Sequence, residues 1–371
     1  VLIEDGKIIR VSTEAVSGFT GETIDGKGKI LTPGFVAALN SIGLVEVSAV
    51  SRTRDASEDK ATITFDPSYA FNPFSTVIPF ALKGGVTHSV VSPGGGKDMF
   101  KGQGFVVEHT SSLDSVIDTE TFTYADVGAE SKGSRTTSLQ SLIKKLEDTQ
   151  KKLEKDAEKK DEEEDKKKAK DPSKEDMLFE AILKGEQPLV IDADRYTDIL
   201  HLIDIKKQFG IDMVISSASD AIVVKSQLAD AGIPVIINPM ANRPGFDSMH
   251  NHLSNAAELA NAGVKVMFSA GTHSVEQLRY DAGNAVSNGM SVEDAVKAIS
   301  SNITSTFGMN SGAVEMGRDA DLVLWSADPF EISSKVEKVW IDGEEISTQS
   351  RHDKLRNRYT KSSKMPRAYS K

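Results

Sequence analysis

The 371-residue sequence contains no cysteine, which excludes disulfides, thiolate metal ligands and cysteine nucleophiles. It also has no apolar run of about 18 residues or more, so no membrane span is predicted. The net charge of −11 argues against nucleic acid as a partner. Val1 already falls within the first predicted strand without a preceding Met. We therefore expect a trimmed N-terminus, which leaves a periplasmic or a cytoplasmic location open.

The central part of the chain alternates short apolar runs with amphipathic helical segments. The runs are rich in β-branched residues, as in buried parallel strands, and they cover 84–93, 188–192, 212–216, 234–238 and 264–269. The helical segments end at a glycine each time, and they cover 199–209, 222–231, 251–262 and 277–288. This alternation predicts a (β/α) barrel, in which functional side chains lie at the carboxyl ends of the strands.

The two ends of the chain have a different pattern. Short strand-like runs closed by Asp-Gly or another glycine turn cover 1–11, 22–31, 312–325 and 339–343. They predict one small β-sandwich assembled from both termini. The expected division is therefore 1–32 and 311–350 for the sandwich, 33–310 for the barrel, and 351–371 for a tail.

Two further segments interrupt the barrel pattern. Residues 92–104 are rich in glycine without the spacing of a phosphate-binding loop, and we expect a loop at the barrel top. Residues 142–177 are a charged helical insertion in which both signs alternate, with Leu142, Leu146 and Leu153 as a thin apolar stripe. We expect the tract from Lys144 to Lys170 to lie outside the core, fraying near 171–172.

The segment 33–43, Pro-Gly-Phe-Val-Ala-Ala-Leu-Asn-Ser-Ile-Gly, resembles the first barrel strand of the amidohydrolase superfamily. There the pattern is Pro-Gly-Phe-(Ile/Val)-Asp-x-His-x-His-x-Gly, and the two histidines bind metal. The terminal strands are similar to the sandwich of its imidazolonepropionase-like members. The resemblance implies an α/β fold, a distorted TIM-like (β/α)8 barrel plus a small β-sandwich, and metal-dependent hydrolysis of non-peptide C–N bonds.

The metal-ligand positions of that family are substituted in this chain. The first two histidines are replaced by Leu39 and Ser41, and the later two by Asp192 and Ser217. The aspartate at the end of the eighth strand is replaced by His273. A catalytic metal site needs about three protein ligands, and zinc prefers imidazole to hydroxyl or apolar groups. We therefore expect no zinc and no cofactor.

The favoured hypothesis is a catalytically degenerate barrel, a pseudoenzyme that binds a small-molecule ligand or serves as a partner subunit. His273 and Asp192 are the remaining candidates for catalytic residues, and Asn40, Asp194 and Ser217 are the candidates for substrate binding. We expect Asp192, Ser217, His273 and Asn40 to converge at the barrel mouth. An Asp–His contact there would lower the pKa of Asp192.

The alternative hypothesis is a hydrolase with a rewired site. Asp192, Asp194 and His273, with Asn40, would then hold a divalent ion other than zinc that prefers oxygen ligands. Catalysis without a metal is a third possibility. A homo-oligomer, or a heterodimer with an active amidohydrolase, is the expected assembly, because a barrel without activity can still serve through its surface. No signature identifies the substrate.

Overall fold

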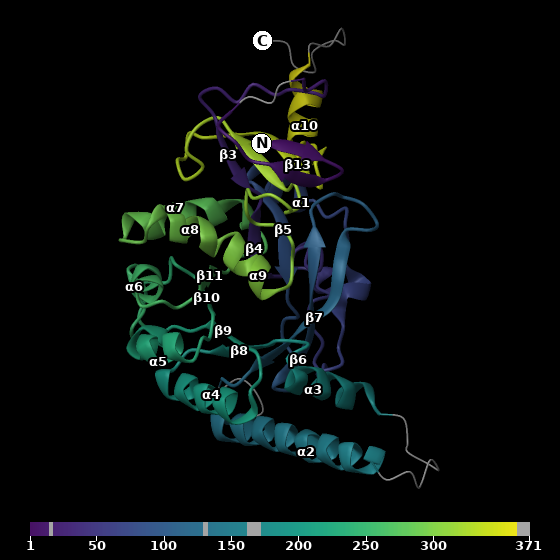
Figure 1. Cartoon of the computed structure of the whole chain (residues 1–371), viewed down its shortest axis with the longest axis vertical. Coiled ribbons are helices and arrows are strands. Elements are labelled where there is room, and N and C mark those ends of the chain that lie inside the picture. The colour runs from purple at the N-terminus through teal and green to yellow at the C-terminus, as the bar shows by residue number, and fades with distance from the viewer. Residues whose placement is uncertain (15–17, 129–132, 162–171, 362–371) are drawn as a thin grey trace, which may run out of the picture.

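An eight-stranded sheet lies at the centre of the computed structural model, which describes residues 1–14, 18–128, 133–161 and 172–361. In spatial order the strands are β4 (Phe35–Asn40), β5 (Val86–Val91), β6 (Phe100–Glu108), β7 (Val116–Asp126), β8 (Leu189–Ala193), β9 (Met213–Ser217), β10 (Val235–Ile237) and β11 (Val266–Phe268). A parallel bridge between Ala38 and Ser269 joins the two edges of the sheet. The predicted distorted barrel is confirmed (Figure 1).

Strand β6 runs antiparallel to both of its neighbours, whereas the other neighbouring strands of the barrel are parallel. The long β6–β7 hairpin was not predicted, because Gly102 and Gly104 were assigned to a loop. Both glycines lie inside β6. A Cβ atom on Gly104 would lie 2.0 Å from the ring of Phe122 on β7, so the missing side chain makes room for that ring.

Apolar side chains fill the interior of the barrel, so the fold has a packed core rather than a pore. Helix α9 (Ser301–Thr306) and the residues after it close the end where the strands begin. The ring of Phe307 packs there against Phe122, with 5.2 Å between ring centroids. Near the other end Leu39 and Tyr124 pack against this core. A ligand therefore has access to the strand ends but not to the barrel axis.

Helices follow the last four barrel strands, as predicted. They are α4 (Tyr196–Phe209), α5 (Lys225–Asp230), α6 (Asn255–Asn261) and α7 (Leu278–Ser287), followed by α8 (Val292–Ala298); α1 (Ile78–Lys83) precedes β5. Short 3-10 turns lie at Ser51–Thr53, Pro67–Ala70, Ala221–Val224 and Val275–Gln277. The glycines predicted to end these helices all have positive φ, namely Gly210, Gly232, Gly263 and Gly289.

Segments from both ends of the chain form one antiparallel sheet. Its order is β14 (Glu344–Glu345), β13 (Val336–Ile341), β12 (Leu322–Trp325) and β3 (Ile30–Pro33). Strands β1 (Leu2–Glu4) and β2 (Lys7–Arg10) form a separate hairpin, and α10 (Arg351–Thr360) follows the sheet. Figure 1 shows these elements at one end of the molecule and α2 and α3 at the other.

The charged insertion forms α2 (Arg135–Asp161) and precedes α3 (Lys174–Lys184). Leu142 and Leu146 are fully buried and belong to the main hydrophobic core. The expectation that the tract from Lys144 onward lies outside the core is therefore wrong at Leu146. The apolar stripe of the helix was too thin to indicate burial from sequence alone. Residue 171, where fraying was expected, lies outside the described residues.

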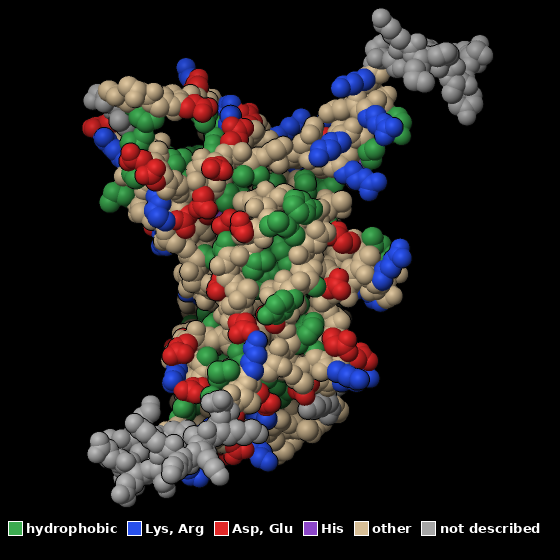
Figure 2. All heavy atoms as spheres, turned by 90° about the vertical axis from the view of Figure 1, so that its right-hand side faces the viewer, with side chains coloured by type: hydrophobic (Ala, Val, Ile, Leu, Met, Phe, Trp, Pro, Cys, Tyr) green, Lys and Arg blue, Asp and Glu red, His purple; other side chains and the backbone are tan. Residues whose placement is uncertain are grey.

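The molecular surface mixes charges of both signs. On the face drawn in Figure 2, acidic and basic side chains lie close together, and hydrophobic side chains run between them along the middle of the molecule. A broad basic surface for nucleic acid is not seen on this face. No helix within the described ranges combines the length and the apolar character that a membrane span requires.

We predict that Leu146→Ala lowers the free energy of unfolding by about 2 to 5 kcal/mol, because it leaves a cavity beneath α2. Chemical denaturation followed by circular dichroism measures this difference. Lys151→Ala, at an exposed position on the same helix, is the control and should change stability by less than about 0.5 kcal/mol. Equal stability of the two variants would show that α2 does not contribute to the core.

Candidate functional site

A hollow of about 410 Å³ opens at the carboxyl ends of the barrel strands. The ends of β4 and β7 to β10 and the loop after β10 contribute to its wall. The lining residues are Leu39, Tyr124, Asp192, Asp194, Ser216, Ser217, Ser219, Ile236, Asn238, Ala241, Ser248, Asn251 and Ser269. In barrels of this kind, functional sites lie at this end. The hollow is therefore the candidate site.

Asp192, near the end of β8, is the carboxylate at the centre of the hydrogen bonds in this hollow. Its Oδ2 accepts from the hydroxyl of Ser217 at 2.6 Å, from Tyr124 at 3.2 Å and from Ser216 at 3.3 Å. Its Oδ1 accepts no hydrogen bond from a described residue, and it is not among the buried atoms without a partner. That oxygen is therefore open to the hollow.

Burial raises the pKa of Asp192 to about 6. The hydroxyl of Ser217 opposes this shift, the charges of Asp194 and Asp126 reinforce it, and the hydroxyl of Tyr124 opposes it again. The pKa of Tyr124 is itself raised by burial, so its hydroxyl stays protonated and donates. The predicted lowering of the Asp192 pKa is wrong, because burial raises this pKa by more than the hydroxyl donors lower it.

The second carboxylate of the hollow, Asp194, is held by Ser219. The backbone N–H and the hydroxyl of Ser219 donate to its Oδ1 at 3.2 and 2.6 Å. The next residue, Arg195, turns away: its guanidinium pairs with Asp247 and lies 4.9 Å from the ring centroid of Phe246. The lining thus contains two carboxylates, and neither Lys nor Arg is part of it.

The loop after β10 is fixed over this end of the barrel by charge pairs. Asp247, in this loop, is 3.0 Å from the guanidinium of Arg135 at the start of α2 and also pairs with Arg195. His250, in the same loop, hydrogen-bonds Asp220 at 2.8 Å. The loop supplies Ala241, Ser248 and Asn251 to the wall of the hollow. The insertion helix therefore helps to position the site.

The predicted convergence holds for Asp192 and Ser217 but fails for Asn40 and His273. The buried amide of Asn40 donates to the carbonyl of Ala37 at 3.1 Å and accepts from the N–H of Ile42 at 3.0 Å, so it stabilises a turn. His273 is exposed and hydrogen-bonds Ser48 at 2.9 Å. Among the described residues the predicted Asp–His contact is not formed.

Tyr124 and Ser216 both donate to Asp192, and neither was predicted as a site residue. Tyr124 lies on β7, a strand that was not predicted. Phe122 and Tyr124 are two residues apart, which is the spacing of side chains on one face of a strand. Ser216 directly precedes the predicted Ser217, and both hydroxyls reach the same oxygen. The alternation of side-chain character in 116–126 was the sequence signal that could have identified this strand.

The side chains at this mouth do not fit the zinc site that the resemblance implies. Leu39 presents an apolar side chain to the hollow, and the hydroxyl of Ser217 donates a hydrogen bond to Asp192. No group of three or more His, Asp or Glu in the described part of the chain is arranged to hold a metal ion. One carboxylate with hydroxyl neighbours is not a zinc donor set.

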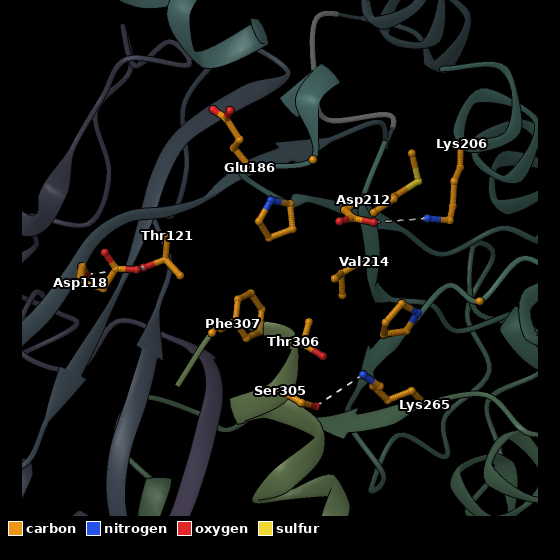
Figure 3. A pocket seen from close by; sticks show the side chains of 16 residues that line it. Asp118, Thr121, Glu186, Lys206, Asp212, Val214, Lys265, Ser305, Thr306 and Phe307 are labelled. Atoms are coloured by element: carbon orange, nitrogen blue, oxygen red, sulfur yellow. Dashed lines mark hydrogen bonds and ion pairs between the residues drawn. The ribbon is translucent and has the colours of Figure 1, made fainter. Parts of the chain in front are cut away.

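A larger hollow of about 520 Å³ lies at the opposite end of the barrel, where the strands begin (Figure 3). Its two lysines have partners: Lys206 donates to the carbonyl of Ile211 at 3.0 Å, and Lys265 donates to the hydroxyl of Ser305 at 3.4 Å. Side chains at this end of a barrel commonly serve stability rather than chemistry. We therefore assign the candidate site to the Asp192 hollow.

Comparison with known proteins agrees with the fold. Residues 131–346 match the sequence profile described as "Amidohydrolase family". The structure is similar to an amidohydrolase from Thermotoga maritima MSB8, with a TM-score of 0.84, 27% identity, and coverage of 93% of this chain and 94% of that chain.

Two further relatives are more distant. The chain is 23% identical over 400 residues to the amidohydrolase tasK of Hapsidospora irregularis, which covers 92% of this chain. The chain spans only 39% of the length of that relative. A β-aspartyl dipeptidase from Fervidobacterium islandicum AW-1 has a TM-score of 0.57 at 15% identity, with coverage of 92% of this chain and 90% of that chain, and this likeness concerns the fold alone.

We predict that Asp192→Asn stabilises the folded protein at pH 7.5 by about 1 to 3 kcal/mol, because a buried carboxylate with a raised pKa disfavours the fold when ionised. This penalty is complete above about pH 6, the pKa in the folded state, and absent below about pH 4, near the pKa of the unfolded chain. Thermal unfolding at pH 7.5 and at pH 4 measures the difference in stability between Asp192→Asn and the wild type.

Asp281→Asn on α7 is the matched variant for this measurement. Burial raises the pKa of Asp281 to about 6 as well, and Asp281 is not part of the lining of the hollow. Asp281→Asn should also be more stable than the wild type at pH 7.5, and this increase in stability should also disappear at pH 4. If Asp192→Asn is instead less stable than the wild type at pH 7.5, the hydroxyl donors outweigh burial.

Proposed function

This chain belongs to the amidohydrolase family, and we propose that it is a catalytically degenerate member whose barrel mouth binds a small polar ligand. Membership implies a hydrolase-like barrel. The proposal rests on the hydrogen bonding of Asp192. Its Oδ2 accepts hydrogen bonds from three hydroxyl groups, and its Oδ1 is open to the hollow. A function must be argued from the site rather than from the fold.

The substitutions at the mouth support loss of the family reaction. Metal-assisted hydrolysis needs about three ligands and an open position for water. Leu39, Ser41 and Ser217 replace three of the histidines, and no replacement restores an imidazole beside Asp192. The hollow and its polar lining are nevertheless intact. A polar hollow without imidazole ligands is better suited to binding a ligand than to metal-assisted hydrolysis.

A rewired hydrolase is the second candidate, and the raised pKa of Asp192 favours it. A carboxylate with a pKa of about 6 is suited to act as a general base near neutral pH. His273 does not line the hollow, and its Nε2 lies 2.9 Å from the hydroxyl of Ser48. In this arrangement the reaction would depend on Asp192 and Asp194, without the third residue expected from the sequence.

We predict that the purified protein holds less than about 0.1 zinc per chain and does not hydrolyse amides, because its mouth lacks the imidazole ligands. Elemental analysis measures the metal. Ammonia and amine release from a β-aspartyl dipeptide and a set of cyclic amides, with and without added zinc, measures the activity.

Asp192→Asn and Asp281→Asn serve as the test and control variants in this assay. Rates at the level of the uncatalysed reaction for all three proteins support degeneracy. Stoichiometric zinc at the barrel mouth would overturn it. Turnover that disappears in Asp192→Asn and persists in Asp281→Asn would favour the rewired hydrolase instead.

A partner-subunit role is compatible with the same degenerate site. Tyr69 and Phe74, in the segment between β4 and β5, are 91% and 63% exposed, which leaves aromatic surface for another chain. We predict a homodimer or a heterodimer with an active amidohydrolase, burying at least about 1,000 Å². Size-exclusion chromatography with light scattering measures the mass. A monomer at all micromolar concentrations, alone and mixed with a homologue, would contradict the assembly.

A further inference from the structure

We propose that the mouth ligand carries a protonated amine or an amidinium group that pairs with Oδ1 of Asp192. This inference rests on the ligand-binding role proposed above, and it names the chemical class of the ligand. The amino or amidinium N–H would donate to the oxygen of Asp192 that accepts no hydrogen bond from a described residue. Its apolar body would lie against Leu39 and Ile236.

The hydrogen bonds of the Asp192 carboxylate are asymmetric. All three hydroxyl donors, from Ser217, Tyr124 and Ser216, reach Oδ2. They fix the plane of the carboxylate while Oδ1 stays free. Oδ1 has lone pairs of its own that accept no hydrogen bond from a described residue, so a ligand donor is accommodated there without displacing a protein contact.

The charged side chains that line the hollow are acidic. Asp192 and Asp194 line it, and the nearby Asp126 further raises the pKa of Asp192 through its charge. Two cations near this end of the barrel have other partners. Arg195 pairs with Asp247, and the buried Lys101 donates to the carbonyls of Gly96 and Asp98, both at 2.9 Å, and lies 3.8 Å from Asp126. Since no Lys or Arg of the described residues lines the hollow, a cationic ligand would supply the counter-ion for Asp192 and Asp194.

The walls of the hollow combine apolar and polar side chains. Leu39 replaces the first metal ligand of the family with an apolar side chain, and Ile236 also lines the hollow. Around them Asn238, Asn251 and Ser269 offer amide and hydroxyl groups. This combination fits an organic cation with an apolar body. An anion would meet two like charges, and a neutral ligand would leave the carboxylates uncompensated.

Protonation of Asp192 should control the interaction. With a pKa of about 6, Asp192 is ionised at pH 7.5 and protonated below pH 5. Binding of a cation should therefore weaken as the pH falls through about 6. A ligand held only by apolar contacts would not show this dependence.

The experiment compares three probes of nearly equal shape: benzylamine, which is cationic at pH 7.5, benzyl alcohol, which is neutral, and benzoate, which is anionic. Titrations of the full chain, followed by NMR chemical shifts of the amides around the hollow, give the dissociation constants. The proteins are the wild type, Asp192→Asn, and Asp281→Asn as the matched control outside the hollow. Circular dichroism shows that each variant is folded.

We expect wild-type protein to bind benzylamine at least about tenfold more tightly than benzyl alcohol or benzoate, with shifts confined to the mouth. Asp192→Asn should abolish this preference, and Asp281→Asn should keep it. Benzylamine binding should also fall at least about fivefold between pH 7.5 and pH 5, as Asp192 becomes protonated.

Two other outcomes would overturn the inference in different ways. If benzyl alcohol or benzoate binds at the mouth as tightly as benzylamine, the mouth binds ligands but does not select cations, and only the ligand class is wrong. If none of the probes shifts an amide around the hollow, both the cation selectivity and the proposed ligand-binding role are overturned.

Discussion

The contact between the terminal sheet and the first barrel strand sets the position of the rest of the structure. β3 pairs with β12 in the sheet and leads through Gly34 directly into β4 of the barrel. The N–H of Gly34 donates to the carbonyl of Asp321 at 2.7 Å, and a Cβ on Gly34 would lie 2.1 Å from the hydroxyl of Thr87. Only glycine fits there, and it fixes where β4 enters the barrel. The end of β4, with Leu39, is thereby held at the mouth.

The burial of Asp192 is the second constraint, and it works against stability. A carboxylate without a cationic partner disfavours folding when it is ionised. The three hydroxyl donors reduce this penalty but do not remove it, since the pKa stays raised at about 6. Groups that weaken a fold in this way occur often at sites of binding or chemistry. Asp281 shows that such a pKa alone identifies no site, because it does not line the hollow.

Local signals in the sequence were sufficient for much of the fold, and they failed where the outcome depends on distant contacts. Glycines with positive φ end the helices after β8 to β11, as their sequence positions predicted. The β6–β7 hairpin was not predicted, because Gly104 makes room for the ring of Phe122, which lies on another strand. At the site, Asp192 and Ser217 could be placed together, since parallel strand ends share one edge. Leu39 has a φ of +48°, and the side-chain amide of Asn40 hydrogen-bonds the backbone of Ala37 and Ile42, which residue spacing does not reveal.

The charges at the mouth set its electrical character. In a metal-dependent barrel, bound cations polarise a carbonyl and stabilise the negative charge that develops on it. Here the side chains that line the hollow include hydroxyl groups and the apolar Leu39, and the charges are those of Asp192 and Asp194. The fixed charge of the protein at the mouth is therefore negative. The substrates of metal-dependent relatives are therefore a poor guide to what this mouth binds, and its own side chains are the better one.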